Sequence, residues 1–169
     1  MPANSRLMQA ADLPAVIALQ DCCYSADLYE PPELLATRLA CARQSCWVAE
    51  NTRGELLAYL FSYPSLPGKI TELATDFTVA EKPELLYLHD MAVSENARGL
   101  GVAKMLLNRA RLHAVQLGLS GLALVAVQGS VSYWQKQGFV VQTPLSATAQ
   151  AALNSYTGER AQYMFQLLS

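Results

Sequence analysis

The sequence predicts a mixed α/β fold arranged around a central sheet, and three observations support this. The chain has 169 residues, 52% of them hydrophobic and 15% charged, which is enough for one domain with a sizeable core. An apolar strand pattern at Leu85–Val93 is followed by an amphipathic helix pattern at 101–117. A short, uniformly apolar run at 122–127 then has the character of a buried strand. Strand, helix and strand in this order form a parallel βαβ unit.

Short strands and helices are predicted on both sides of this unit. Asp12 is a plausible N-cap for the first helix, and the pair Pro31-Pro32 opens the second. Strands are expected at 5–9, 46–50, 56–63, 139–142 and 161–168, and helices at 12–24, from 31 onward, 130–137 and 148–156. The chain shows no internal repeat and no boundary, so residues 1–169 are expected to form a single domain.

The segment 64–83 interrupts the regular pattern. Pro64, Pro67, Gly68 and Pro83 break it up, and charged side chains keep it polar. Loops of this length inside a compact domain are often functional. Two interpretations remain open: the segment forms a wall of a substrate site, or it is a solvated connector.

Composition and charge exclude several function classes. The net charge of −2 argues against a general nucleic-acid surface. The longest apolar run, 119–127, is too short for the roughly 20 residues that span a bilayer, and the N-terminus lacks a signal-peptide pattern. The cysteines form no C-x-x-C pair and no metal-like spacing with either histidine. We therefore expect reduced thiols, no metal site, no membrane partner and a cytoplasmic location. The cysteines are Cys22, Cys23, Cys41 and Cys46, and the histidines are His89 and His113.

A glycine-bearing loop joins the strand at 85–93 to the following helix. Backbone N–H groups at a helix N-terminus favour an anion, and Gly99 and Gly101 allow close approach. A Walker loop is excluded because no G-x-x-x-x-G-K-[ST] run exists. A dinucleotide loop is disfavoured because Lys104 stands where the third glycine would be. A purely structural glycine turn remains the alternative.

Three segments together resemble the GCN5-related N-acetyltransferases (GNAT). The run Arg98-x-x-Gly101-x-Ala103 matches the family motif [Q/R]-x-x-G-x-[G/A]. Residues 89–93 (HDMAV) resemble the family's fourth strand, and residues 133–139 (YWQKQGF) resemble its aromatic-x-x-x-Gly-Phe segment. The resemblance is close over 85–140 and extends loosely over the whole chain.

The resemblance implies a mixed sheet of about six to seven strands with about four helices. It also implies that two splayed parallel strands, here 85–93 and 122–127, hold acetyl-CoA between them. The loop would bind the pyrophosphate, the strand would contact the pantetheine arm, and Gln128 and Trp134 could also contact the cofactor. The cofactor residues expected in this way are Met91, Ala92, Val93, Arg98, Gly99, Leu100, Gly101, Val102, Ala103, Lys104, Gln128 and Trp134.

The implied chemistry needs a neutral amine. An alkylamine has a pKa near 10.4, so a base is useful at pH 7. His89 and Asp90 occupy the position of an acidic pair found in many relatives, and His89 is the better candidate because imidazole titrates near neutrality. Side chains alternate along a strand, so only one of the two is expected on a given face.

The proton donor to the leaving thiolate is less clear from the sequence. Trp134 occupies the place of the family's usual tyrosine, and an indole is no acid. Thiolate leaves readily because its reference pKa is only about 8.5. Either no side-chain acid is needed, or Tyr133, Tyr156 or Tyr163 supplies the proton. Tyr133 cannot simply replace its neighbour, because it lies about 100° away on the helix.

The sequence therefore predicts an acetyl-CoA-dependent N-acetyltransferase acting on a small-molecule or protein amine. The alternative is a catalytically weak acyl-CoA-binding sensor or interaction module of the same fold. Modification of a protein N-terminus is a third option, and the sequence leaves open whether the chain forms a homodimer. Plausible liners of the acceptor site are Tyr24, Tyr29, Glu30, Glu33, Tyr156 and Tyr163.

Overall fold

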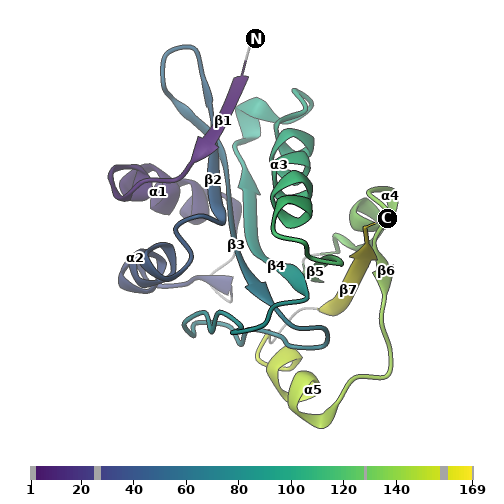
Figure 1. Cartoon of the computed structure of the whole chain (residues 1–169). Coiled ribbons are helices and arrows are strands. Elements are labelled where there is room, and N and C mark those ends of the chain that lie inside the picture. The colour runs from purple at the N-terminus through teal and green to yellow at the C-terminus, as the bar shows by residue number, and fades with distance from the viewer. Residues whose placement is uncertain (1–2, 25–27, 128, 157–159, 169) are drawn as a thin grey trace.

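The computed structural model of the chain describes residues 3–24, 28–127, 129–156 and 160–168. Its centre is a seven-stranded mixed sheet with the strand order β1-β2-β3-β4-β5-β7-β6 (Figure 1). The strands are β1 (Ala3–Leu7), β2 (Cys46–Asn51), β3 (Leu56–Ser65), β4 (Leu85–Val93), β5 (Gly121–Ala126), β6 (Val140–Val141) and β7 (Gln162–Leu167). Only β4 and β5 are parallel among the described pairs, so the predicted βαβ unit is confirmed.

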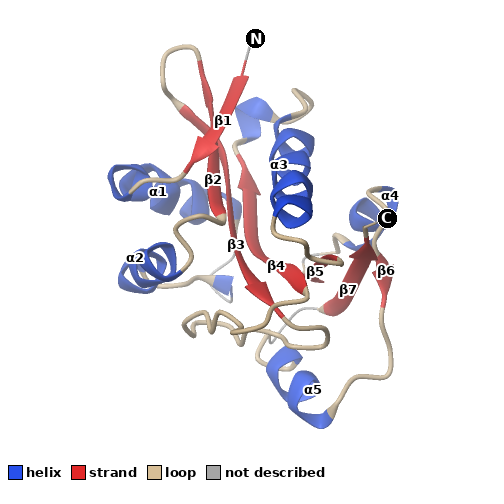
Figure 2. Cartoon of the chain, in the orientation of Figure 1, coloured by secondary structure: helices blue, strands red, loops and turns tan. Residues whose placement is uncertain are grey.

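Five α-helices lie around the sheet in the described part of the chain. They are α1 (Leu13–Cys23), α2 (Pro32–Cys41), α3 (Val102–Gln116), α4 (Val131–Lys136) and α5 (Ala147–Leu153), with short 3₁₀ turns at η1 (Ala10–Asp12) and η3 (Glu95–Ala97). This is one helix more than the resemblance implied. Figure 2 shows α1 and α2 on one side of the sheet and α3 on the other.

The two faces of the sheet bury two separate apolar clusters. The first cluster joins α1, α2 and α5 to one face, with Val16, Leu35 and Leu153 among its buried members. The second joins α3 to the opposite face through a stripe that includes Val102, Leu106, Leu107, Ala110 and Ala114. Apart from the adjacent Leu106 and Leu107, these positions lie three to four residues apart, as an amphipathic helix requires. Apolar periodicity therefore accounts for which face each helix covers.

The ends of α1 and α3 follow from local chemistry. Asp12 is the N-cap residue of α1 and a proline occupies its first turn, as predicted. Asp12 does not cap with its side chain, because its carboxylate oxygens accept hydrogen bonds from Arg6 at 2.8 Å. The α3 helix ends at Gln116, just before Gly118, whose φ of +72° favours glycine.

The segment 66–84 has no regular structure but is not simply solvated. Ile70, Thr71 and Phe77 are buried, and Leu73 N–H donates to Ser155 Oγ at 2.9 Å. Phe77 stacks on Tyr63 with ring centroids 4.4 Å apart. The segment is therefore a packed wall that closes one end of the first apolar cluster.

No helix in the described part of the chain is long and apolar enough to cross a lipid bilayer.

Candidate active site

A cavity of about 760 Å³ opens where β4 and β5 separate. The parallel pairing joins 85–88 of β4 to 121–124 of β5 and stops there, although β4 continues to Val93 and β5 to Ala126. Beyond Leu88 and Leu124 the two strands splay, and the cavity fills the gap between them. The splayed parallel pair predicted from the sequence is therefore present.

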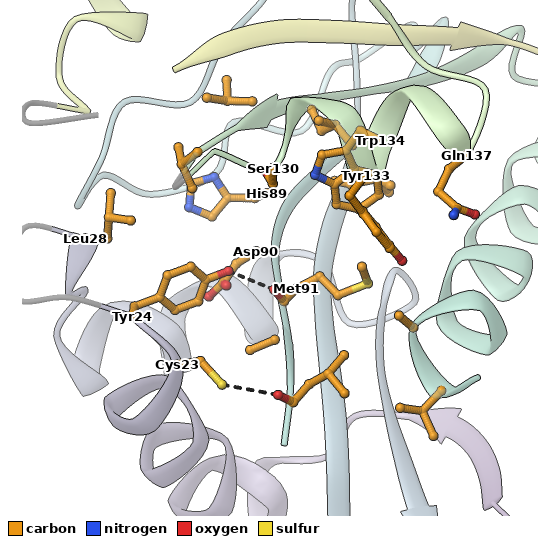
Figure 3. A pocket seen from close by; sticks show the side chains of 18 of the residues that line it. Cys23, Tyr24, Leu28, His89, Asp90, Met91, Ser130, Tyr133, Trp134 and Gln137 are labelled. Atoms are coloured by element: carbon orange, nitrogen blue, oxygen red, sulfur yellow. Dashed lines mark hydrogen bonds between the residues drawn. The ribbon is translucent and has the colours of Figure 1, made fainter. Parts of the chain in front are cut away.

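The cavity reaches both faces of the sheet (Figure 3). On the face covered by α3 and α4, here named the loop side, its lining includes Met91, Val93, Arg98, Gly101, Val102, Lys104, Tyr133 and Trp134. On the face covered by α1 and α2, here named the carboxylate side, its lining includes Tyr24, Leu28, Glu30, Leu73, His89, Asp90, Val125 and Tyr156. One cavity thus connects two chemically different halves through the sheet.

The glycine loop forms one wall of the loop side. Gly99 and Gly101 have φ of +81° and +78°, and a Cβ at either position would meet no atom within 4 Å. The Gly101 carbonyl accepts the first helical bond of α3, from Met105 N at 3.0 Å. Among the described residues, no group accepts a hydrogen bond from the N–H groups of Gly99, Gly101 or 102–104. These donors, with the cations of Arg98 and Lys104, fit an anionic group.

Leu100 departs from the predicted loop pattern. Its N–H donates to Ala97 O at 3.2 Å, so it is not free for a ligand. Its side chain is 47% exposed and does not line the cavity. The sequence places Leu100 among the cofactor residues, but the structure uses its N–H in the turn that follows η3. Gln128 lies outside the described residues.

The open edge of β4 also presents backbone groups to the cavity. Met91 O accepts a hydrogen bond from Tyr24 OH at 2.8 Å, and Val93 O accepts one from Cys23 Sγ at 3.4 Å. Both donors come from α1 and its C-terminal end, and neither comes from β3. Because the N–H and C=O of one strand residue point to the same side, the N–H groups of Met91 and Val93 also face the gap.

A β-bulge places His89 and Asp90 on the same face of the sheet. Phe61 pairs with Asp90 while Ser62 pairs with Leu88, so His89 is an extra residue in β4. Both side chains line the carboxylate side of the cavity, as Figure 3 shows. The expected alternation of the two side chains is therefore wrong, because it assumed an unbroken ladder.

His89 is held by a buried ion network. Its Nε2 lies 3.0 Å from Glu30 Oε1, and its side chain is 2% exposed. Glu30 also pairs with Arg38 Nη1 at 2.7 Å and accepts a hydrogen bond from Ala74 N at 2.8 Å. Burial alone would raise the pKa of Glu30, but the charges and hydrogen bonds of His89 and Arg38 outweigh it and hold that pKa well below its usual range. Glu30 is therefore an anion at neutral pH.

The ion network determines which nitrogen of His89 is free. Because an ionised carboxylate can only accept, His89 Nε2 carries the hydrogen that points at Glu30. His89 Nδ1 has no hydrogen-bond partner among the described residues and is buried. In a neutral imidazole with this arrangement, Nδ1 holds the free lone pair.

Asp90 also lines the cavity and is buried beside His89. Its Oδ2 accepts a hydrogen bond from Tyr59 OH at 3.0 Å, whereas its buried Oδ1 has no partner among the described residues. Burial raises the pKa of Asp90 to about 6. The carboxyl is thus largely ionised at neutral pH and carries an unused acceptor.

The candidate tyrosines divide into two groups. Tyr133 lies in α4 beside Trp134, with ring centroids 5.0 Å apart, and both residues line the loop side. Burial raises the pKa of Tyr133, so its hydroxyl stays protonated at neutral pH. Tyr156 also lines the cavity, but its hydroxyl donates to Thr71 O at 2.8 Å. The Tyr163 hydroxyl instead accepts from Gly68 N at 3.0 Å, and Tyr163 does not line the cavity.

The acceptor-side residues expected from the sequence are brought together only in part. Tyr24, Glu30 and Tyr156 line the cavity, whereas Tyr29 and Glu33 do not. Sequence reasoning missed Arg38, which is fully buried against Glu30. A signal was available, since Arg38 follows Leu34 and Leu35 by one turn and therefore lies on the apolar face of its helix. A cation on such a face indicates a buried ion pair.

The model of the acetyltransferase (GNAT) family matches residues 13–139, which include α1, the bulged strand, the glycine loop and Phe139. The chain belongs to the GNAT family. No curated protein matches the chain at a significant level.

Solved structures with the GNAT fold superimpose over nearly the whole chain. Ard1 from Thermoplasma volcanium has a TM-score of 0.74 at 14% identity, covering 100% of this chain and 99% of that one. The GphF GNAT-like decarboxylase, solved in complex with isobutyryl-CoA, has a TM-score of 0.78 at 15% identity over 98% and 100%. The ribosomal-protein-S18-alanine N-acetyltransferase from Escherichia coli has a TM-score of 0.70 at 14% identity over 99% and 95%. At these identities the likeness is one of fold.

Among the described residues, no three His, Cys, Asp or Glu side chains form a group that could hold a metal ion.

Proposed function

We propose that the chain is a cytoplasmic, single-domain N-acetyltransferase that moves an acetyl group from acetyl-CoA to a primary amine. The observation that carries this proposal is the cavity through the sheet, with free N–H donors on its loop side and two unpartnered acceptors on its carboxylate side. Membership of the GNAT family supports it. The loop side would hold the donor, and the carboxylate side would hold the amine.

The loop side fits coenzyme A. The N–H groups of Gly99, Gly101 and 102–104, with Arg98 and Lys104, would bind the pyrophosphate. The N–H groups of Met91 and Val93, which face the gap, would bind the pantetheine arm, with Ala92 between them and Trp134 on the opposite wall. Bound acetyl-CoA supplies the acetyl group as a thioester, which a neutral amine attacks with release of the CoA thiol.

His89 would act as the general base. Its Nδ1 is the free lone-pair atom because Glu30 holds the hydrogen on Nε2. Arg38 would act as a positioning residue, since it keeps Glu30 ionised and in place. The ionised Asp90 would attract the substrate as an ammonium ion through Oδ1. His89 would then remove a proton from that ammonium ion.

Tyr133 would donate a proton to the departing thiolate. It is the tyrosine of the candidate set that lines the loop side, and its hydroxyl stays protonated at neutral pH. Its contribution is expected to be small, since a thiolate with a reference pKa of about 8.5 leaves readily.

A CoA-binding module with little catalysis is the second candidate. It is favoured by one observation, the indole of Trp134 at the position where the family usually has a tyrosine acid. Such a module would bind acyl-CoA on the loop side and leave amines unmodified.

Calorimetry and a thiol-release assay over an amine panel test the proposal. We expect acetyl-CoA to bind and His89→Gln to lower kcat by about 10²–10⁴-fold, because the base is lost while the side chain stays polar. Tyr133→Phe should lower kcat by less than about tenfold, in line with the ease of thiolate departure. The matched control is His113→Gln, since His113 contacts Ser45 at 3.0 Å and does not line the cavity.

Two outcomes would overturn the proposal. Absence of acetyl-CoA binding at high micromolar concentration would exclude both candidates. Tight binding without turnover of any amine would leave the CoA-binding module. Circular dichroism of each variant separates a loss of the base from a loss of folding.

A further inference from the structure

Among the described residues, the carboxylate side of the cavity contains no lysine or arginine with an unpaired charge. All twelve lysines and arginines of the chain lie within the described residues. Of these, Arg98 and Lys104 line the cavity, and both belong to the glycine loop on the loop side. Arg38 is nearest to the carboxylate side, but it is fully buried and its charge is paired with Glu30.

The polar atoms that this half offers suit a single ammonium group. Asp90 and His89 line the cavity. Among the described residues, Asp90 Oδ1 and His89 Nδ1 have no hydrogen-bond partner, and neither atom can serve a carboxylate while it acts as an acceptor. Glu30 is already neutralised by Arg38. With Asp90 ionised and His89 in the neutral form that a general base requires, the half-cavity has one unmatched negative charge and therefore accommodates one positive charge.

The remaining wall of the carboxylate side is apolar or aromatic. Leu28, Leu73 and Val125 contribute aliphatic surface, and Tyr24 and Tyr156 contribute rings. Both tyrosine hydroxyls donate to backbone carbonyls, of Met91 and Thr71 respectively, at 2.8 Å. Their rings are thus the part of each side chain that remains for a substrate body.

We infer that the amine acceptor is a primary monoamine with an uncharged, apolar body, of the alkyl or arylalkyl class, and that carboxylated or phosphorylated amines are rejected. This inference rests on the proposed function and narrows its substrate. A carboxylate placed in this half would lose its water without gaining a cation and would face Asp90. Amino acids should therefore be poor substrates, although their amine is the same group.

A matched set of three amines tests the inference. Phenethylamine and L-phenylalanine share a body and differ by one carboxylate, and L-phenylalaninamide restores the size of that group without its charge. We expect kcat/KM for phenethylamine to exceed that for phenylalanine by roughly 100-fold or more, with phenylalaninamide much closer to phenethylamine. Equal or better turnover of phenylalanine would overturn the inference.

A gain-of-function variant makes the test independent of lost activity. Leu73→Arg places a cation on the wall of the carboxylate side, at a half-buried position. It should lower the ratio of kcat/KM for phenethylamine to kcat/KM for phenylalanine by about tenfold or more, since the carboxylate then has a cationic partner. The control is Leu66→Arg, because Leu66 lies in the same segment, is 37% exposed and does not line the cavity.

The outcomes separate this inference from the proposed function. If no amine is acetylated although acetyl-CoA binds, the proposed function fails. If carboxylated amines are acetylated as well as uncharged monoamines, the inferred substrate class is wrong and the proposed function stands. Faster acetylation of an N-terminal peptide than of any monoamine would also overturn the inference, in favour of a protein substrate.

Discussion

Under the proposed function, Asp90 combines a role in binding with a cost in stability. Its side chain lies between Tyr59 and the cavity, and burial raises its pKa to about 6. Above that pH the protein holds a desolvated charge with one unused oxygen. A group of this kind is typical of functional sites, where the fold keeps a reactive state that stability alone would not select.

The raised pKa of Asp90 predicts a pH-dependent stability difference. Because the folded pKa lies above the unfolded value of about 3.8, the folded state binds more protons between pH 4 and 6. The contribution of Asp90 to the free energy of unfolding is therefore fully present below about pH 4 and is lost as the pH rises through 6. Urea unfolding should show the free energy of unfolding of the wild type falling by about 2 kcal/mol relative to that of Asp90→Asn between pH 4 and pH 7.

The comparison with Asp90→Asn removes the pH dependence of stability that comes from other titratable groups. Glu30 has a lowered pKa, so its contribution changes in the opposite direction, being lost as the pH falls. Glu30 is present in both proteins, so the difference between their curves reports the charge of Asp90, including its repulsion by Glu30. Parallel stability curves for the two proteins over this pH range would contradict the assigned burial of Asp90.

At the scale of elements, the loop between β4 and α3 combines glycines in a left-handed backbone conformation with free N–H donors. Gly99 and Gly101 adopt positive φ, and the first turn of α3 leaves its N–H groups free. An L-residue at either position would be strained even without a clash. The loop therefore needs glycine for its backbone conformation, and under the proposed function it also needs glycine for close approach of a ligand.

A comparison of Gly101→Ala with Gly54→Ala should separate the need for glycine in the backbone conformation from the need for glycine in ligand approach. Both glycines have φ of +78°, and an added Cβ meets no atom within 4 Å at either position. Each variant should lose about 1 kcal/mol of stability, because the strain is the same. Calorimetry should show an acetyl-CoA affinity loss of about tenfold or more for Gly101→Ala alone, since Gly54 lies in the β2–β3 turn. Equal affinity losses in the two variants would argue against a ligand at the loop.

At the scale of the whole molecule, the cavity joins elements from both layers. Its lining comes from α1, β4, α3, β5, α4 and the segment after β3. The parallel ladder that would otherwise hold β4 to β5 is missing along the splay. A ligand that fills the gap therefore connects parts of the fold that the sheet leaves unjoined.

Coenzyme A should accordingly raise the melting temperature. A ligand at 100 times its dissociation constant adds about 2.7 kcal/mol of stability. For a chain of this size that corresponds to a shift of about 5–10 °C in a thermal melt. ATP at the same concentration is the control, because it has phosphates but no pantetheine arm, and it should shift the melt by less than about 1 °C. Equal shifts would indicate general anion binding.

Much of the fold could be read from local patterns. The strand Leu85–Val93 was predicted with its observed bounds, and α3 and β5 were predicted to within about one residue at each end. Apolar periodicity determines such elements because the residues that specify them are neighbours in sequence. The helix expected at 148–156 is α5 (Ala147–Leu153), a seven-residue element whose N-cap Ser146 accepts from Ala149 N at 3.1 Å.

The parts of the site formed by residues that are neighbours in sequence could be predicted. The parts that depend on how distant segments pair could not. The glycine loop and Tyr133–Trp134 were identified from short motifs, and these residues line one cavity apart from Leu100. The pairing of Glu30 with His89 joins residues 59 positions apart, and no local pattern specifies it. The bulge at His89 is a property of two paired strands, so the single strand gave no sign of it.

The sequence by itself determined the resemblance to the family and the position of the candidate cofactor loop. Both are carried by contiguous residues whose backbone geometry is local, as with Arg98 to Ala103 at the start of a helix. Only the tertiary structure decided the arrangement of the candidate acceptor half of the site. There the register of β3 and β4 turns His89 and Asp90 to one face, and α2 buries Arg38 against Glu30. These contacts bring distant residues into a water-poor space, where pairing and burial set charge and proton location.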